Sequence, residues 1–301
     1  MASIGRLNNV IRAWEEGRPA FASFANANRQ TAIEFSTAPY DGIVFEMEHN
    51  PWDVEGLQDS LQYLLNRKQL VTSGSLAPAV TPIVRIPSNG VEMNQSFAKQ
   101  ALDRGVYGVV WPHIGNAEQA YNAVASCRYA RKSTAELYEP AGVRGDGRAS
   151  ACRYWGLTLP EYYRKADVWP LNPDGEILVI TMIESVQGVQ NVDDILRSVP
   201  GIGCVLIGEG DLSQALGHPR QYDHPEVRDA MKHIVETCKK YGVPVGHPHV
   251  TSMNVEKVVA EGYRFLMSAP VRTYDAIQKA KELTGKTVAN SSLEPQEQGQ
   301  H

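Results

Sequence analysis

The fold class is decided by the stretch ILVITMIESVQGVQNVDDILRSVPGIGCVLIGEGDLS, residues 177–213. It begins with an almost wholly apolar run at Ile177–Ile183, continues through helix-like apolar spacing at 189–198, and ends with a second apolar run at Cys204–Ile207. Neither run alternates with polar residues, which is typical of parallel strands that are covered on both faces. The stretch therefore predicts one strand–helix–strand crossover unit.

The same alternation recurs along the rest of the chain. Apolar runs predict strands at 20–24, 42–45, 82–86, 108–111, 177–183, 204–207, 243–246 and 264–267. Helix-like spacing follows at 54–67, 91–104, 116–130, 189–198, 225–241 and 253–261. Strands that alternate with helices in this way predict an α/β fold, a single-domain (β/α)8 TIM barrel, whose catalytic residues lie at the carboxyl ends of the strands.

We expect this barrel domain to occupy residues 1–286. The segment 131–175, between the fourth and fifth predicted strands, is too long for an ordinary loop, and it predicts an active-site cover with a short helix. Residues 287–301 are polar and rich in Gln and Ser, which predicts a disordered tail.

The composition argues against several classes of partner. The 301 residues are 43% hydrophobic, which is enough for a large core, and the formal net charge is -5. No basic run resembles a nucleic-acid footprint, and no apolar stretch approaches the roughly 18 residues of a membrane span. The four cysteines are widely spaced, as in reduced structural thiols. We expect a cytoplasmic protein that binds neither nucleic acid nor membrane.

Polar side chains follow five of the predicted strands at their carboxyl ends. Because these ends converge on one opening in a barrel, the side chains should meet above the core. They are Glu46, Glu48, His49, Arg85, Trp111, His113, Glu184 and Asp211.

Glu184 and Asp211 are the best candidates for metal ligands, because each follows an apolar strand and the two strands are neighbours. A pair of carboxylates suits a hard divalent cation, Mg²⁺ first, with Mn²⁺ or Co²⁺ as alternatives. The alternative for Asp211 is that it caps the helix that follows.

Five segments stand in order at these strand ends: IVFEMEHNPWD (43–53), PIVRIP (82–87), AGVRGDG (141–147), MIESVQG (182–188) and LIGEGDLSQALG (206–217). Together they resemble the signature segments of the HpcH/HpaI family of class II pyruvate aldolases, over about residues 6–285. The Trp-Pro-His run at 111–113, with the long segment 131–175, further resembles the macrophomate synthase branch of that family.

The resemblance implies a divalent-metal-dependent carbon–carbon lyase or aldolase that forms the enolate of pyruvate. The enolate would come from retro-aldol cleavage of a 4-hydroxy-2-oxo acid, or from decarboxylation of oxaloacetate as in the macrophomate synthase branch. It could then add to an aldehyde or another electrophile. The resemblance also implies a homo-oligomer, as a dimer, trimer or hexamer.

Family roles in binding carry over to matching residues. Glu184 and Asp211 would hold the metal, and the backbone N–H groups of Gly210 and Asp211 would receive the substrate carboxylate, as the field at a helix N-terminus favours. Trp111 and His113 would contact substrate, unless His113 only satisfies a buried backbone group.

Family roles in catalysis fall on the second and third strand ends. Arg85 would lie beside the keto oxygen of the 2-oxo acid, with a salt bridge to Glu46 or Glu48 as the alternative. His49 would be the general base, directly or through water, unless it is structural. Glu46 would orient or charge His49, although the family usually has Asp at that position.

Two further positions depart from the family. Met182 stands where a Gln is usual, and Glu209 stands where a Pro is usual, a change that we expect to affect the loop more than the chemistry.

Two other functions remain open. The spacing of His247 and His249 could bind zinc in a metal-dependent hydrolase of barrel fold. A non-catalytic barrel that binds an oxo acid is the second alternative.

Overall fold

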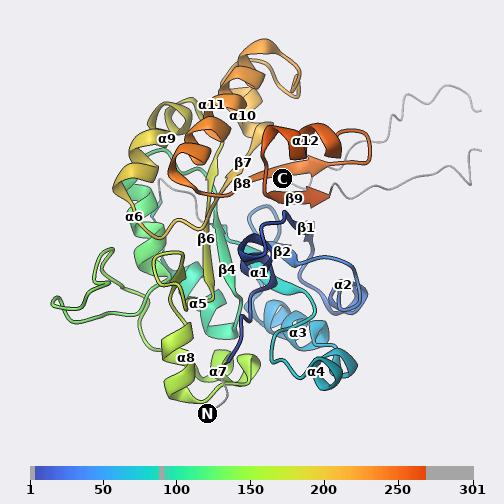
Figure 1. Cartoon of the computed structure of the whole chain (residues 1–301), viewed down its shortest axis with the longest axis vertical. Helices are drawn as coiled ribbons and strands as arrows, with labels where there is room; N and C mark the ends of the chain where they lie inside the picture. The colour runs from blue at the N-terminus through green and yellow to red at the C-terminus, as the bar shows by residue number, and fades with distance from the viewer. Residues whose placement is uncertain (1–3, 88–91, 94, 269–301) are drawn as a thin grey trace, which may run out of the picture.

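The computed structural model describes residues 4–87, 92–93 and 95–268, and these form a closed barrel of parallel strands wrapped by helices (Figure 1). The sheet order is β4-β3-β2-β1-β9-β8-β7-β6, and β6 pairs back onto β4. The barrel strands are β1 (Ala20–Ala25), β2 (Gly42–Glu46), β3 (Thr81–Arg85), β4 (Gly108–Trp111), β6 (Ile177–Ile183), β7 (Cys204–Ile207), β8 (Val245–Val250) and β9 (Phe265–Ser268). A short strand, β5 (Val168–Trp169), pairs with the start of β6. The predicted TIM barrel is therefore confirmed.

Helices connect successive strands. They are α2 (Arg29–Phe35), α3 (Val54–Leu64), α4 (Arg67–Ser73), α5 (Ser96–Arg104), α6 (Ala117–Ser126), α7 (Ala149–Trp155), α8 (Leu159–Lys165), α9 (Val186–Ser198), α10 (Glu209–Ala215), α11 (Pro225–Tyr241) and α12 (Val255–Glu261). Helix α1 (Asn9–Glu15) precedes β1. Of these described helices, none combines the length and apolarity that a membrane span requires. The predicted tail at 287–301 and the end of the expected domain lie outside the described residues.

Helix α1 lies across the amino end of the barrel. The side chain of its N-cap residue, Asn8, donates to the backbone carbonyls of Tyr107 and Glu176 at 3.2 and 3.1 Å, and these residues precede β4 and β6. Val10 and Ile11 are fully buried in the apolar cluster that the inward-facing strand residues form. The carboxyl end of the barrel is therefore the end left for a site.

The segment 131–175 is not the active-site cover that we expected. Trp155 in α7 donates through Nε1 to the carbonyl of Gly105 at 2.8 Å, and its ring stacks on Tyr107 with the ring centroids 4.3 Å apart. Both partners precede β4, so α7 packs at the amino end of the barrel. In Figure 1, α7 and α8 lie at the bottom of the view and α10 lies near the top.

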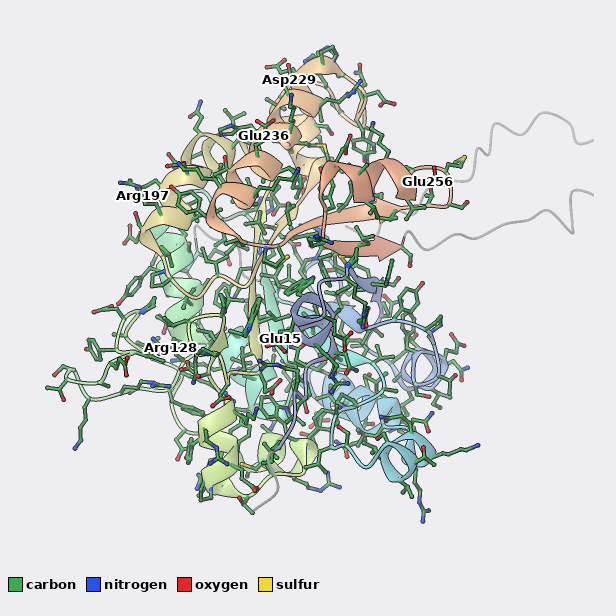
Figure 2. The ribbon with its side chains drawn as sticks, in the orientation of Figure 1. Glu15, Arg128, Arg197, Asp229, Glu236 and Glu256 are labelled. Atoms are coloured by element: carbon green, nitrogen blue, oxygen red, sulfur yellow. The ribbon has the colours of Figure 1, made fainter. Side chains whose placement is uncertain are left out.

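The loop before α7 is fixed near the same end. Arg128, labelled in Figure 2, donates to the backbone carbonyls of Leu137 and Pro140 at 2.6 and 2.7 Å. It follows α6, which leads from the carboxyl end of β4 back toward the amino end. The length of the segment predicted a cover over the active site. Its large aromatic side chains are instead buried at the amino end of the barrel.

Candidate active site

Residues from five strand ends meet at the carboxyl end of the barrel. Glu46 ends β2, Arg85 ends β3, and Glu184 directly follows β6. His113 lies two residues beyond β4, and Asp211 lies in the first turn of α10, which follows β7. The contacts described below join them into one cluster, so the structure brings most of the predicted residues together.

Arg85 is a buried cation held between two carboxylates. Its side chain forms an ion pair with Glu46, with Nε donating to Oε2 at 2.6 Å, and its Nη1 lies 3.1 Å from Oε2 of Glu48. The ring of Phe24 lies beneath the guanidinium, with its centroid 4.7 Å from Cζ. These are the salt bridges of the alternative interpretation, and they also fix the guanidinium at the end of β3.

Glu46 shapes the turn that follows β2. Its Oε1 accepts hydrogen bonds from the backbone N–H groups of Glu48 and His49, at 2.8 and 3.2 Å. Its other oxygen is engaged by Arg85. Glu46 therefore orients the backbone of His49, whereas the carboxylate beside the His49 imidazole is that of Glu48, with Oε2 3.5 Å from Nε2.

Glu48 connects several site residues, although the sequence indicated it only as an alternative salt-bridge partner of Arg85. Besides Arg85 and His49, it approaches His113, with Oε1 3.7 Å from Nε2. Burial raises the pKa of Glu48 to about 7, against the lowering effect of Arg85 and with a further increase from Glu184. Its place in the sequence, one residue before His49 at a strand end, was the signal available.

Glu184 and Asp211 form a donor set that fits a divalent cation. One ligand atom from each of His113, Glu184 and Asp211 lies within 4.8 Å of the other two. Glu184 is only 3% exposed, and its burial, together with the charge of Asp211, raises its pKa to about 7. Two carboxylates this close are stabilised by a cation, and oxygen donors with one imidazole suit Mg²⁺, Mn²⁺ or Co²⁺.

The backbone of His113 takes part in holding Glu184. Its N–H donates to Oε1 of Glu184 at 2.6 Å, and its ring Nδ1 lies 3.5 Å from the same oxygen. To do this, His113 adopts a left-handed φ of 55°, which in a residue other than glycine costs about 1–3 kcal/mol and is often found at functional sites. Its half-buried ring faces both Glu48 and Glu184, so it adds a nitrogen donor to the predicted metal pair.

Two glycines give the site its space. A Cβ on Gly208 would lie 2.6 Å from Cβ of Glu184 and closer still to its carboxylate, so only glycine fits there. Gly208 is thus a site residue that the sequence analysis missed. Gly210 borders open space instead, since no heavy atom lies within 4 Å of the place where its Cβ would be. The expected contact of the Gly210 N–H with a substrate carboxylate stays a prediction.

Trp111 is the exception among the predicted substrate-binding residues. It ends β4, but its side chain is 1% exposed and belongs to the apolar cluster between the barrel and the helices. Side chains alternate along a strand, and the preceding residue, Val110, is the one that faces the interior of the barrel. We therefore withdraw Trp111 from the substrate-binding residues.

His247 and His249 both approach Glu209 rather than a set of metal ligands. His249 Nδ1 is hydrogen-bonded to Glu209 Oε1, and His247 Nε2 lies 3.8 Å from Glu209 Oε2. Burial lowers the pKa of His247, which favours its neutral form. Among the described residues, the groups of at least three potential ligands within 4.8 Å of one another include neither histidine. This arrangement does not favour the zinc hydrolase alternative.

The comparisons with known sequences agree on one family. A model of the HpcH/HpaI aldolase/citrate lyase family matches residues 21–269. A 5-keto-4-deoxy-D-glucarate aldolase of Klebsiella pneumoniae subsp. pneumoniae is 34% identical over 222 residues, which is 74% of each chain. A Citrobacter koseri protein of the same name is 32% identical over 222 residues, again 74% of each chain.

Solved structures share the fold. An HpcH/HpaI aldolase/citrate lyase family protein from Burkholderia cenocepacia has a TM-score of 0.72 and 24% identity, and the match covers 92% of this chain and 98% of that one. Macrophomate synthase has a TM-score of 0.62 and 20% identity, with 94% of this chain and 89% of the other covered. At these identities the likeness establishes the barrel architecture.

Proposed function

Because the chain belongs to the HpcH/HpaI aldolase/citrate lyase family, we propose that it is a divalent-metal-dependent carbon–carbon lyase that forms the enolate of pyruvate. Its substrate is a 4-hydroxy-2-oxo acid, cleaved by retro-aldol reaction, or oxaloacetate, which loses CO₂. In the reverse direction the enolate adds to an aldehyde or another electrophile. The observation that carries the proposal is the buried Glu184 beside Asp211, on the same barrel end as Arg85.

Glu184 and Asp211 would hold the metal, with the His113 ring as a third donor. A divalent cation at this position polarises the C2 carbonyl of the 2-oxo acid and stabilises negative charge on its oxygen. Mg²⁺ is our first candidate because two of the donors are carboxylates. Mn²⁺ and Co²⁺ are the alternatives, because they accept an imidazole ligand as well as carboxylates.

Arg85 stabilises the enolate from the side of β3. As a fixed guanidinium in a buried position, it is a preorganised donor for the charge that develops on the C2 oxygen. The ion pairs with Glu46 and Glu48 prevent it from leaving that position. The backbone N–H groups of Gly210 and Asp211, in the first turn of α10, receive the substrate carboxylate.

His49 is the base for the aldol step. In retro-aldol cleavage it removes the proton from the 4-hydroxyl group, and the C4–O bond becomes the C=O bond of an aldehyde, which leaves. The bond between C3 and C4 breaks, and the electron pair of that bond forms the enolate. Protonation at C3 then releases pyruvate. The carboxylate of Glu48, with Oε2 3.5 Å from Nε2 of His49, orients the ring for this step.

The relatives indicate where to look for the substrate. The names of the Klebsiella and Citrobacter proteins specify 5-keto-4-deoxy-D-glucarate. We infer that hydroxylated 2-oxo acids with a second carboxylate are the first compounds to assay, together with oxaloacetate. We also propose a cytoplasmic homo-oligomer, whose state gel filtration with light scattering will measure.

Release of pyruvate from these acids, with and without chelator, tests the proposed function. We expect turnover that stops on chelation and returns with Mg²⁺ or Mn²⁺. His247→Ala should lower turnover far less than Glu184→Gln, because His247 approaches Glu209 rather than the metal ligands, whereas a zinc hydrolase would lose its activity with His247. Metal binding without pyruvate release from any of these acids, or from oxaloacetate, would support the non-catalytic binder instead.

A further inference from the structure

The helix that carries Asp211 begins without a side-chain cap. Its N-cap residue is Gly208, which has no side chain to accept a hydrogen bond from the N–H groups of the first turn of α10. By contrast, Ser185 caps α9 by accepting from the N–H of Gly188. A capping side chain at position 208 is excluded, since even a Cβ there would collide with Glu184. Because Glu184 packs against position 208, the helix that carries Asp211 lacks the side-chain cap that usually holds the first turn of a helix.

Glu209, the first residue of α10, supplies a different restraint. Its carboxylate is 4% exposed and is bonded to His249 on β8, with His247 as a second neighbour at 3.8 Å. His249 is itself held, because its carbonyl accepts from the side chain of Asn254 at 2.9 Å and its N–H donates to His247 Nδ1 at 3.2 Å. The first turn of α10 is therefore tied to the neighbouring strand.

The side chains of Glu209 and Asp211 leave α10 in different directions. Glu209 and Asp211 are two residues apart, which in an α-helix turns their side chains about 200° away from each other. Glu209 contacts the histidines of β8 while Asp211 faces Glu184 and His113. A contact on one side of the turn can thus fix the direction of a ligand on the other.

We propose that Glu209 and His249 form a positioning pair that holds the first turn of α10 so that Asp211 stays in place to bind the divalent cation. This inference rests on the proposed function, because it assigns Asp211 to the metal. Outer contacts that orient metal ligands typically contribute about 10- to 100-fold to metal affinity. Proline is favoured at the first position of a helix because its fixed φ suits the first turn, so Glu209→Pro should replace part of the restraint.

The test is the binding of Mn²⁺ alone to the metal-free protein, measured by calorimetry. We expect Glu209→Ala and His249→Ala each to weaken binding about 10- to 100-fold, and the double variant to be no weaker than either single one. Glu209→Pro should recover part of the affinity. Asp59→Ala is the control, since it removes a carboxylate that is bonded to Arg29 at 2.6 Å and that lies on α3, outside both groups of potential metal ligands.

Two outcomes separate the inference from the proposed function. If Asp211→Asn loses Mn²⁺ binding but Glu209→Ala and His249→Ala bind as the unmodified chain does, the positioning role is wrong and the metal site stands. If Asp211→Asn binds normally, the metal assignment itself is wrong. If circular dichroism shows Glu209→Ala to be unfolded, His249→Ala decides alone, because it removes the same contact from the side of β8.

Discussion

Single residues decide what this barrel end can do, and Glu184 is the clearest case. It is buried, it accepts a hydrogen bond from a backbone N–H of a strained residue, and it fits only because position 208 is glycine. A buried carboxylate and a strained backbone each lower the stability of the folded protein unless they serve a function. A divalent cation bound at Glu184, as we propose, would offset the buried charge.

Gly208→Ala tests this packing. The added methyl must displace the Glu184 side chain, so we expect metal affinity to fall about tenfold or more. Gly210→Ala is the matched control, because its methyl enters open space two residues away. Titration with Mn²⁺ measures both variants, and equal affinities would show that Glu184 does not depend on Gly208.

His49→Ala should separate the two routes to the enolate. Loss of CO₂ from oxaloacetate needs no base, whereas aldol cleavage must remove a hydroxyl proton, so cleavage should fall about 10²- to 10⁴-fold and decarboxylation far less. Steady-state rates with both substrates provide the measurement. An equal loss of the two activities would place His49 in binding or in structure.

Arg85→Lys and Arg85→Ala address the stabilisation of the enolate. Loss of one preorganised donor to an oxyanion lowers kcat by about 10²- to 10³-fold, and lysine should restore only part because it lacks the planar fork. The kcat for oxaloacetate decarboxylation is the readout, with circular dichroism to check folding. A kcat unchanged in Arg85→Ala would rule out this role.

At the scale of elements, the pattern of the sequence predicted some boundaries well and others poorly. The strands Ile177–Ile183 and Cys204–Ile207 and the helix Pro225–Tyr241 agree with prediction, because apolar period and flanking glycines coincide there. Strand β8 runs on to Val250, through histidines that we placed beyond it, with an irregular register against β9. Polar residues at a strand end do not reveal how far the pairing continues.

The site shows the same limit. Side chains alternate along β4, and the side chain of Trp111 points outward, away from the interior of the barrel. The sequence could not show this, because it does not tell which residues of a strand face the interior. Glu48 was named only as a possible partner of Arg85, because two carboxylates and a histidine stand within four residues of sequence. Only the side-chain directions show that Glu48 also approaches His49.

Trp155→Ala tests the placement of the segment 131–175. Removing a ring that stacks on Tyr107 should lower the free energy of unfolding by about 3–5 kcal/mol and leave Mn²⁺ affinity unchanged, because α7 packs at the amino end. Leu159→Ala in the exposed part of α8 is the control and should have little effect. Urea unfolding and metal titration check both; weaker Mn²⁺ binding in Trp155→Ala would contradict this placement.

For the whole molecule, closure of the barrel is what creates the site. Glu46, Arg85, His113, Glu184 and Asp211 come from residues up to 165 positions apart in sequence, and they meet because parallel strands of one closed sheet share their carboxyl end. The amino end, covered by α1 and α7, serves stability instead. Because parallel strands share this end, a strand-end pattern predicted that these side chains would lie together.

The most direct test of the central claim is exchange of the methyl protons of pyruvate with deuterium from D₂O, followed by NMR. Enolate formation at Glu184, Asp211 and Arg85 predicts rapid exchange with Mg²⁺ or Mn²⁺, and none after chelation or in Glu184→Gln and Asp211→Asn, whose neutral amides cannot balance a divalent charge. Exchange that continues in both variants after chelation, or its absence in the metal-loaded protein, would contradict the account.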